Sequence, residues 1–306
     1  MGWSTRRAVT LVVAVFGAVL VAVLVTMPAA SALSANHGAS FAVRCPFTRD
    51  PPHRLSDDPI VYPDDPGAAH SHDFFGNVTT DAYSTYGDGT EHDLLGKGTT
   101  CLRTGDTAAY WMPTVSWKDQ QGTHVLTSNR AVFYYRAGGK DHRKVKPFPG
   151  GLKVITDDAG HISWRCADKG KGSRNPPKQC DTEKLGVRII FPDCVAVASD
   201  GEPRLDSDNH RSHMAYSSVR DSKVRCPRSH PRSVPVLTMN VIFPIPATPG
   251  RVTLACDEES PCGASTMHAD FWNTWNQAEL ERLVTRCINN VSPSKPRPDK
   301  CRAPVV

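Results

Sequence analysis

The chain has 306 residues and a formal net charge of +5, of which the N-terminal Arg6 and Arg7 contribute two and the segment from Val291 onward contributes three. The body between them is therefore neutral, which argues against nucleic acid as a partner, because nucleic-acid binding needs a concentration of basic charge. About 250 residues form one large core more readily than two, so we predict a single domain.

The N-terminus has the features of an export signal. The two arginines precede an apolar run from Ala8 to Val25, and Ala30-Ser31-Ala32 is a small-x-small cleavage pattern. This order is typical of a cleaved secretory leader, although the run is long enough for an uncleaved membrane anchor. We predict a signal peptide at residues 1–32, a linker at 33–40 and a secreted protein. The alternative is a surface protein that contacts the membrane only through its uncleaved leader.

Ten cysteines occur, and no two of them are spaced as C-x-x-C. An even number in an exported chain favours disulfides, and the missing spacing argues against a thiolate zinc site or a thioredoxin-like redox centre. We predict that Cys45 pairs with Cys101 and that Cys256 pairs with Cys262.

Strand-like stretches dominate the middle of the chain. They are rich in aromatic and β-branched residues, and they span residues 108–117, 131–135, 152–156, 187–191 and 234–243. The 25 prolines favour short strands joined by ordered loops, because proline fixes φ and removes a hydrogen-bond donor.

One helix is expected near the C-terminus. Asn276 is a suitable N-cap with Glu279 three positions later, and one face then carries apolar side chains at Leu280, Leu283, Val284 and Ile288. We predict a mainly β fold, an antiparallel sandwich or jelly roll with long disulfide-tied loops and this C-terminal helix. The globular domain is expected at residues 41–290, followed by a basic flexible tail at 291–306.

Three segments combine histidine with a nearby carboxylate. They are His70-Ser71-His72-Asp73, Asp208-Asn209-His210-Arg211-Ser212-His213 and His268-Ala269-Asp270. In an extended segment, residues two apart project from the same face. We therefore predict that the three segments converge on one polar site. The candidate catalytic residues are His72, His213, His268 and Asp270, and the candidate metal ligands are His70, His72, His210, His213, His268 and Asp270.

Three uses of these residues remain open. Neutral imidazole and carboxylate together bind a divalent metal ion such as zinc, with Asp73 or Asp208 as a hydrogen-bond acceptor behind a ligating histidine. A histidine near its pKa can also act as a general acid or base. The third use is a buried hydrogen-bonded network that ties loops to the sheet. No P-loop, G-x-G-x-x-G or G-x-S-x-G is present, so nucleotide cofactors and a hydrolase elbow are unsupported. The cofactor is left open, with a divalent metal ion as the candidate.

Several aromatic residues are candidates either for stacking on sugar rings or for the core, and the core is the more common use of such side chains. They are Tyr110, Trp111, Trp117, Tyr134, Tyr135, Trp272 and Trp275.

The sequence resembles the exported domain-of-unknown-function family numbered nineteen-ninety-six, found in actinobacteria and filamentous fungi, over about residues 41–290. The resemblance is carried by Arg44-Cys45-Pro46, Asp58-Pro59-Ile60-Val61, His70-Ser71-His72-Asp73-Phe74-Phe75-Gly76, Thr99-Thr100-Cys101, Ala109-Tyr110-Trp111-Met112-Pro113, Phe191-Pro192-Asp193-Cys194, Leu205-Asp206-Ser207, His210-Arg211-Ser212-His213-Met214-Ala215-Tyr216, Cys226-Pro227 and His268-Ala269-Asp270-Phe271.

The resemblance implies a secreted protein, in fungi often joined to sugar-binding modules, and it carries over the histidine motifs listed above. One departure is that Val195-Ala196 follows Cys194, where the family usually has Trp-Asp-Gly, so a sugar-stacking role at this edge is in doubt. We expect a secreted protein with a His/Asp site that acts on extracellular polysaccharide or cell-wall material. The alternative is a non-catalytic module that binds glycan or envelope, with the histidines as structural scaffold.

Overall fold

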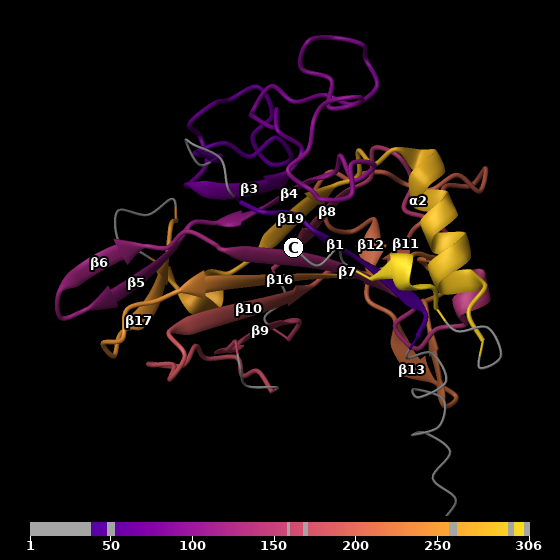
Figure 1. The fold of residues 1–306 in the computed structure, drawn as a ribbon. Coiled ribbons are helices and arrows are strands. Elements are labelled where there is room, and N and C mark those ends of the chain that lie inside the picture. Colours follow the sequence, from indigo (N-terminus) through magenta and orange to yellow (C-terminus); the bar gives the residue numbers. More distant parts are fainter. Residues whose placement is uncertain are drawn as a thin grey trace, which may run out of the picture.

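The computed structural model describes residues 38–47, 53–157, 160–167, 171–256, 262–292 and 297–302. The predicted leader lies outside the described residues. Two five-stranded antiparallel sheets pack face to face, and we name them the lower sheet and the upper sheet from their places in Figure 1. The predicted fold, a mainly β antiparallel sandwich with a C-terminal helix, is confirmed.

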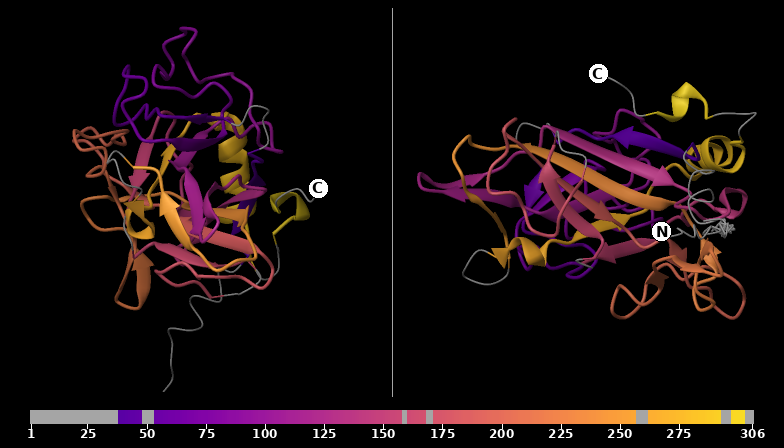
Figure 2. Two further views of the ribbon diagram at one scale, coloured as in Figure 1. Left: turned by 90° about the vertical axis from the view of Figure 1, so that its left-hand side faces the viewer. Right: turned by 90° about the horizontal axis from the view of Figure 1, so that it is seen from below.

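The lower sheet has the strand order β1-β7-β16-β10-β9, and Figure 2 shows it from below. Its strands are β1 (Ser40–Arg44), β7 (Arg130–Arg136), β16 (Val236–Pro244), β10 (Lys184–Ile190) and β9 (Ile162–Cys166).

The upper sheet has the order β2-β3-β4-β19-β8. Its strands are β2 (Arg54–Leu55), β3 (His72–Gly76), β4 (Ala109–Pro113), β19 (Ala269–Trp272) and β8 (Lys153–Thr156).

The main core lies between the sheets, because alternate side chains of each strand face inward. Phe133 and Leu237 enter it from the lower sheet, while Phe75, Tyr110 and Phe271 enter it from the upper sheet. Aromatic residues occupy much of this core, as the composition of the predicted strands suggested.

A second, smaller apolar cluster covers the outer face of the upper sheet. Phe74 and Trp111 contribute from the sheet, and Ile60 and Leu94 contribute from the loops above it. We call these loops, residues 56–71 and 77–107, the cap; they form the indigo and purple coils above β3 and β4 in Figure 1. The upper sheet is therefore buried on both faces.

The predicted strand at residues 108–117 is divided in two. β4 ends at Pro113 and β5 (Val115–Asp119) begins after Thr114, whose hydroxyl donates to the Asp73 carboxylate and whose backbone N–H donates to the Ser71 carbonyl. These two bonds turn the chain out of the upper sheet. β5 instead pairs with β6 (Gly122–Val125) and β17 (Arg251–Leu254), which also pairs with β18 (Cys262–Gly263).

Shorter elements complete the described chain. They are β11 (Cys194–Val195), β12 (Met214–Ala215), β15 (Arg232–Ser233), the hairpin of β13 (Ser218–Arg220) and β14 (Lys223–Arg225), and the short helices η1 (His142–Lys144), η2 (Ala264–Thr266) and η4 (Asp299–Cys301).

The predicted helix forms as α2 (Gln277–Val284) and continues into the π-helical turn η3 (Thr285–Asn289). The Asn276 side chain caps it by accepting the backbone N–H of Glu279 at 3.0 Å, as the sequence predicted. Its apolar face is buried against the sandwich.

All ten cysteines form disulfides, and both predicted pairs are confirmed. The pairs are Cys45–Cys101, Cys166–Cys180, Cys194–Cys226, Cys256–Cys262 and Cys287–Cys301. The last pair ties η4, inside the predicted tail, to η3. Five disulfides indicate an oxidising, extracellular environment. Among the described residues, no helix has the length and apolar character needed to cross a membrane.

Candidate functional site

Two strands of the upper sheet direct polar side chains toward the cap. Successive side chains of a strand face opposite sides of the sheet. On β3, Phe75 enters the main core, so the even-numbered positions His72 and Phe74 face outward. On β19, Phe271 enters the core and Asp270 faces outward for the same reason. His72 and Asp270 therefore lie on one face of the upper sheet despite their separation in sequence.

The intervening strand β4 sets the spacing. His72 pairs with Pro113 and Asp270 pairs with Trp111, so continuing the second register places His268 on the other side of Pro113. With strands about 4.8 Å apart, the two histidine backbones stand about 10 Å from each other. The small proline ring between them leaves room for both imidazoles to extend toward a common point.

The imidazoles of His70, His72 and His268 form a compact group. The ring centroid of His70 lies 4.3 Å from that of His72 and 5.0 Å from that of His268. The Nε2 atoms of His72 and His268 are 3.2 Å apart. His72 is fully buried, whereas His70 and His268 are half-buried, so the group is closed on the protein side and reaches solvent on the other.

Hydrogen bonds to the backbone fix the tautomers of two of these rings. His72 Nδ1 lies 2.9 Å from the Asp57 carbonyl, and His268 Nδ1 lies 3.1 Å from the Thr266 carbonyl. A carbonyl only accepts, so each Nδ1 carries the proton and each Nε2 presents a lone pair. Two lone pairs then face each other at 3.2 Å, an arrangement that requires a cation to be favourable. A tetrahedral zinc ion with bonds of about 2.05 Å separates its nitrogen ligands by about 3.3 Å.

Two buried carboxylates adjoin the imidazoles. Single ligand atoms of Asp58, His72 and Asp270 lie within 4.8 Å of one another, and so do those of the three histidines. Asp58 accepts the backbone N–H groups of Ile60 and Val61, both at 3.0 Å. Asp270 is fully buried, and neither of its oxygens has a hydrogen-bond partner among the described residues. A buried carboxylate without a donor is costly, and a bound cation would remove that cost.

The electrostatics of the pocket favour neutral imidazole. Burial, followed by the nearby charges of His70 and His268, holds the pKa of His72 well below its usual range. Burial is also the main reason that the pKa of His268 is lowered to about 4. Burial raises the pKa of Asp270 well above normal, with the Asp58 charge as the next cause. Both histidines are therefore in the metal-binding form at neutral pH, and Asp270 is held where a negative charge lacks compensation.

The third histidine segment does not join this group. His213 Nε2 lies 2.6 Å from the Lys153 carbonyl and His213 Nδ1 lies 3.0 Å from the Ser207 hydroxyl, so both ring nitrogens are already engaged. His210 Nδ1 donates to Asp206 at 2.9 Å. The structure thus brings together His70, His72, His268 and Asp270, and it places His210 and His213 in hydrogen bonds at the end of β8.

The same segment nevertheless approaches the rim of the site through Arg211. Its guanidinium pairs with Asp157 at 3.0 Å, and Asp157 follows β8 directly, at the position that would face His268 if the β8–β19 register continued. The charges of this pair reach His268 and Asp270. The rim therefore carries one exposed cation and one exposed anion.

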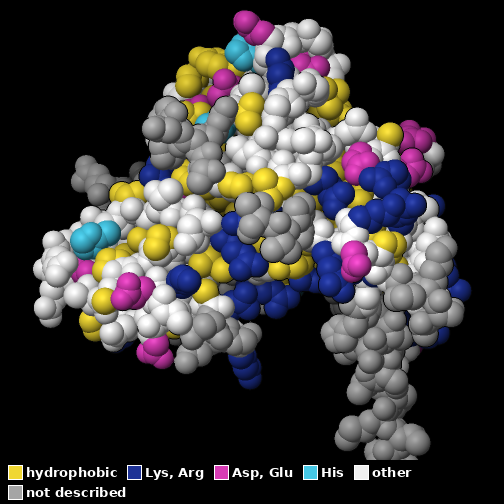
Figure 3. Space-filling view, viewed as in Figure 1, with side chains coloured by type: hydrophobic (Ala, Val, Ile, Leu, Met, Phe, Trp, Pro, Cys, Tyr) yellow, Lys and Arg dark blue, Asp and Glu magenta, His cyan; other side chains and the backbone are white. Residues whose placement is uncertain are grey.

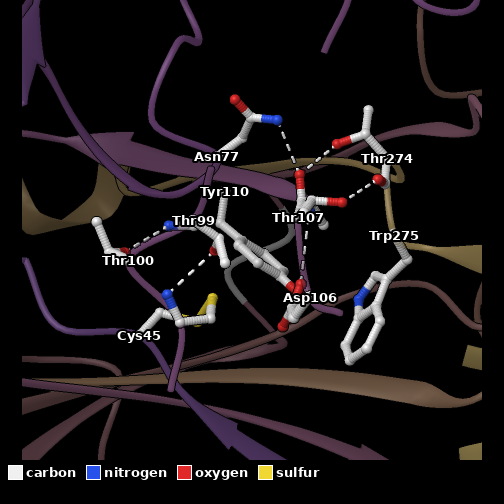
Figure 4. The surroundings of a disulfide bond; sticks show 12 residues. Cys45, Asn77, Thr99, Thr100, Asp106, Thr107, Tyr110, Thr274 and Trp275 are labelled. Carbon is white, nitrogen blue, oxygen red and sulfur yellow. Dashed lines mark hydrogen bonds between the residues drawn. A yellow bond between two sulfur atoms is a disulfide. The ribbon is translucent and has the colours of Figure 1, made fainter. Parts of the chain in front are cut away.

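The aromatic residues considered for sugar stacking belong to the core, apart from the half-buried Tyr134. A further acidic group, Asp106, lies beside Cys45 and Cys101, but the disulfide removes both thiolates as ligands. Figure 4 shows this region, where the Tyr110 hydroxyl donates to Asp106. These residues serve packing and buried hydrogen bonding.

Sequence reasoning missed Asp58 and the carbonyl of Asp57. Both lie in the proline- and aspartate-rich stretch before the first histidine segment, and Asp58 was named only within Asp58-Pro59-Ile60-Val61, one of the motifs that carry the family resemblance. That motif and its proximity to the His70 segment are the signals that could have pointed to Asp58.

Comparison with known proteins gives one match. A family model described as "Domain of unknown function (DUF1996)" matches residues 58–275, a span that begins at Asp58 and includes every residue of the imidazole and carboxylate group. No curated protein and no solved structure matches the chain.

Proposed function

Because the chain belongs to the DUF1996 family, whose description assigns no activity, we propose from the site itself that it is an exported, metal-dependent protein acting on extracellular polysaccharide or cell-wall material. The main observation behind this proposal concerns His72 and His268. Their Nε2 atoms are 3.2 Å apart with lone pairs facing each other, and both Nδ1 protons are donated to backbone carbonyls. Metal-ligating histidines usually donate their other ring N–H in this way, to a backbone carbonyl or a carboxylate.

The donor set favours a borderline divalent ion of the zinc class. His70, His72 and His268 form one group of possible ligands with three imidazoles, and Asp58, His72 and Asp270 form a second group that shares His72. Mixed nitrogen and oxygen donors suit zinc, and they bind copper more tightly by general affinity order. Magnesium and calcium prefer oxygen alone.

The position of the site is compatible with chemistry on an external substrate, because His70 and His268 are only half-buried. A bound metal would act there as a Lewis acid and lower the pKa of a coordinated water. In this arrangement, His72 and His268 would bind the metal ion, Asp270 would compensate its positive charge, and Asp58 is placed to accept a proton. The disulfides support an extracellular location, where such polymers are the available substrates.

Zinc titration by calorimetry, with elemental analysis of the protein as purified, tests the metal site. We expect one equivalent of tight binding, weakened at least about 100-fold in His72→Ala and His268→Ala, since each removes an imidazole ligand. His124→Ala is the matched control. His124 is a half-buried histidine of β6 that lies outside the group and pairs with Asp119 of β5. Equal zinc affinity in all four proteins would overturn the proposal.

The substrate class is tested separately on a panel of polysaccharides and cell-wall preparations, with products detected by mass spectrometry. We expect turnover that is lost with EDTA, restored by zinc, and absent from His72→Ala. Capture by insoluble glycan without any product would instead support the non-catalytic binding module. In that case, the histidine variants should lower thermal stability and leave glycan capture unchanged.

A further inference from the structure

The outer face of the lower sheet carries a set of cations. Core residues such as Phe133 and Val187 face inward, so the alternate positions of the same strands face outward. Those outward positions hold Arg44, Arg130, Arg136, Arg165, Lys184 and Arg188. Figure 3 shows dark blue side chains gathered on the underside of the molecule, over this sheet. We call this surface the arginine face.

The arginine face lacks compensating negative charge. None of the outward positions on its five strands is Asp or Glu. None of its arginines forms an ion pair with a carboxylate in the described part of the chain, whereas Arg54, Arg211 and Arg282 elsewhere are all paired. The composition hides this feature, because acids on other surfaces balance the total.

Two guanidinium groups on this face are also short of acceptors. The Nε atom of Arg44 and the Nη1 atom of Arg136 are buried and have no hydrogen-bond partner among the described residues. The Arg136 guanidinium lies 4.3 Å above the Tyr134 ring, and its pKa is lowered to about 10 by burial and then by repulsion from Arg188. An unpaired buried N–H of a charged group costs free energy, and an anionic ligand would recover it.

Cations and neutral hydrogen-bonding groups share one row of the sheet. Across the strands, Arg44, Val132, Asn240, Arg188 and Ser163 stand side by side in register. A ligand lying along this row would meet a guanidinium at each of the two arginines, an amide and a hydroxyl beside the second one, and the apolar Val132 after the first. Acidic sugars present carboxylates and hydroxyls on one chain, so their chemistry matches this mixture of groups.

We infer that the arginine face is a docking surface for an anionic polysaccharide whose sugars carry carboxylates. The disulfides indicate an oxidising, extracellular environment, where such polysaccharides occur, and a broad sheet face suits an extended chain. The surface lies on the opposite side of the sandwich from the imidazole group, so it is a second site and needs no bound metal.

Binding of polygalacturonate, measured by calorimetry in EDTA at several NaCl concentrations, tests this inference. We expect binding to the purified protein that weakens steadily as salt rises, and no binding to neutral dextran. Arg136→Gln/Arg188→Gln keeps much of each side-chain stem and removes both charges. We expect it to weaken binding at least about tenfold, because it deletes two charge-assisted contacts.

The matched control is Arg220→Gln/Arg225→Gln on the exposed β13–β14 hairpin, which removes the same charge from another surface. It should change affinity less than twofold, and near-ultraviolet circular dichroism should show all variants folded. Equal losses in the two double variants would overturn the inference, and so would absent binding, equal binding to dextran, or preference for poly(glycerol phosphate). Because EDTA is present, the result is independent of the metal proposal.

Discussion

Asp73 and Asp270 are both fully buried carboxylates of the upper sheet, and they differ in their partners. Asp73 receives Arg54 through two N–H groups at 2.6 and 3.1 Å, while Asp270 has no donor in the described chain. In metal-free protein we expect Asp270→Asn to raise the free energy of unfolding by about 1–3 kcal/mol at neutral pH, because it removes an uncompensated buried acid. Asp73→Asn should lower it by about 3 kcal/mol, since Arg54 loses its charge partner.

Urea unfolding in EDTA measures both changes, and zinc titration completes the comparison. Asp270→Asn should combine higher stability with weaker zinc affinity, the trade-off expected of a residue kept for binding. A loss of stability with unchanged zinc affinity would mean that Asp270 is scaffold and would contradict the proposed role.

Asp106, which lies beside the Cys45–Cys101 disulfide and outside the imidazole group, makes the stability of the folded protein depend on pH. It is fully buried, and burial raises its pKa well above normal although the Tyr110 hydroxyl donates to it. The folded protein therefore keeps a proton on Asp106 at pH values where the unfolded chain has lost it. From the folded pKa down to the unfolded value near 3.8, this group makes the folded state more stable as pH falls. Above the folded pKa, that contribution is absent.

Asp106→Asn removes this titration, and urea unfolding of both proteins between pH 4 and pH 8 isolates it, because all other groups are shared. We expect the variant to gain stability relative to the natural chain as pH rises, by about 1.4 kcal/mol for each unit of the pKa difference. Parallel stability curves would show that Asp106 titrates normally in the folded protein.

Gly76 closes β3, and its backbone explains why the His70–Gly76 segment ends in glycine. Its φ is +80°, and an added Cβ would lie 2.1 Å from the Ala108 carbonyl oxygen, a backbone atom that cannot move aside alone. Gly67 in the cap has a similar φ of +83° with nothing near its Cβ position. Gly67→Ala should therefore cost only the conformational penalty of about 1 kcal/mol.

Gly76→Ala adds the clash to that penalty, and we expect a loss of about 3 kcal/mol or more, or failure to secrete folded protein. Thermal and urea unfolding of the two variants measure the difference. If both lost the same small amount, β3 and β4 would be able to separate locally at Gly76, which would contradict this account.

At the scale of elements, sequence patterns predicted what depends on local periodicity. The strand at residues 131–135 and the helix capped by Asn276 follow from alternation and from capping chemistry, and both form as expected. The division of residues 108–117 at Thr114 was not predictable, because its cause is a tertiary hydrogen bond to Asp73. Short-range patterns do not report contacts between distant strands.

At the scale of the molecule, the sequence predicted part of the candidate site correctly and part of it wrongly. His72, His268 and Asp270 share a face because β4 aligns their strands, and their repeated residue types made that convergence worth predicting. His213 has the same residue pattern, yet its ring is held by Lys153 and Ser207. The arginine face was invisible to composition, because total charge says nothing about how charges are distributed over surfaces.

The disulfides differ most in the length of chain that they close. Cys45–Cys101 links the end of β1 in the lower sheet to the cap and spans 56 residues, whereas Cys256–Cys262 spans six. Closing a longer loop removes more entropy from the unfolded chain, so the first bridge should contribute about 4 kcal/mol and the second about 2 kcal/mol. We expect the loss of unfolding free energy in Cys45→Ala/Cys101→Ala to be about twice the loss in Cys256→Ala/Cys262→Ala, as measured by urea unfolding.

The longer bridge also anchors the cap above His72. Cys45→Ala/Cys101→Ala should therefore bind zinc more weakly as well. Equal zinc affinity would show that the cap is held by its apolar cluster alone.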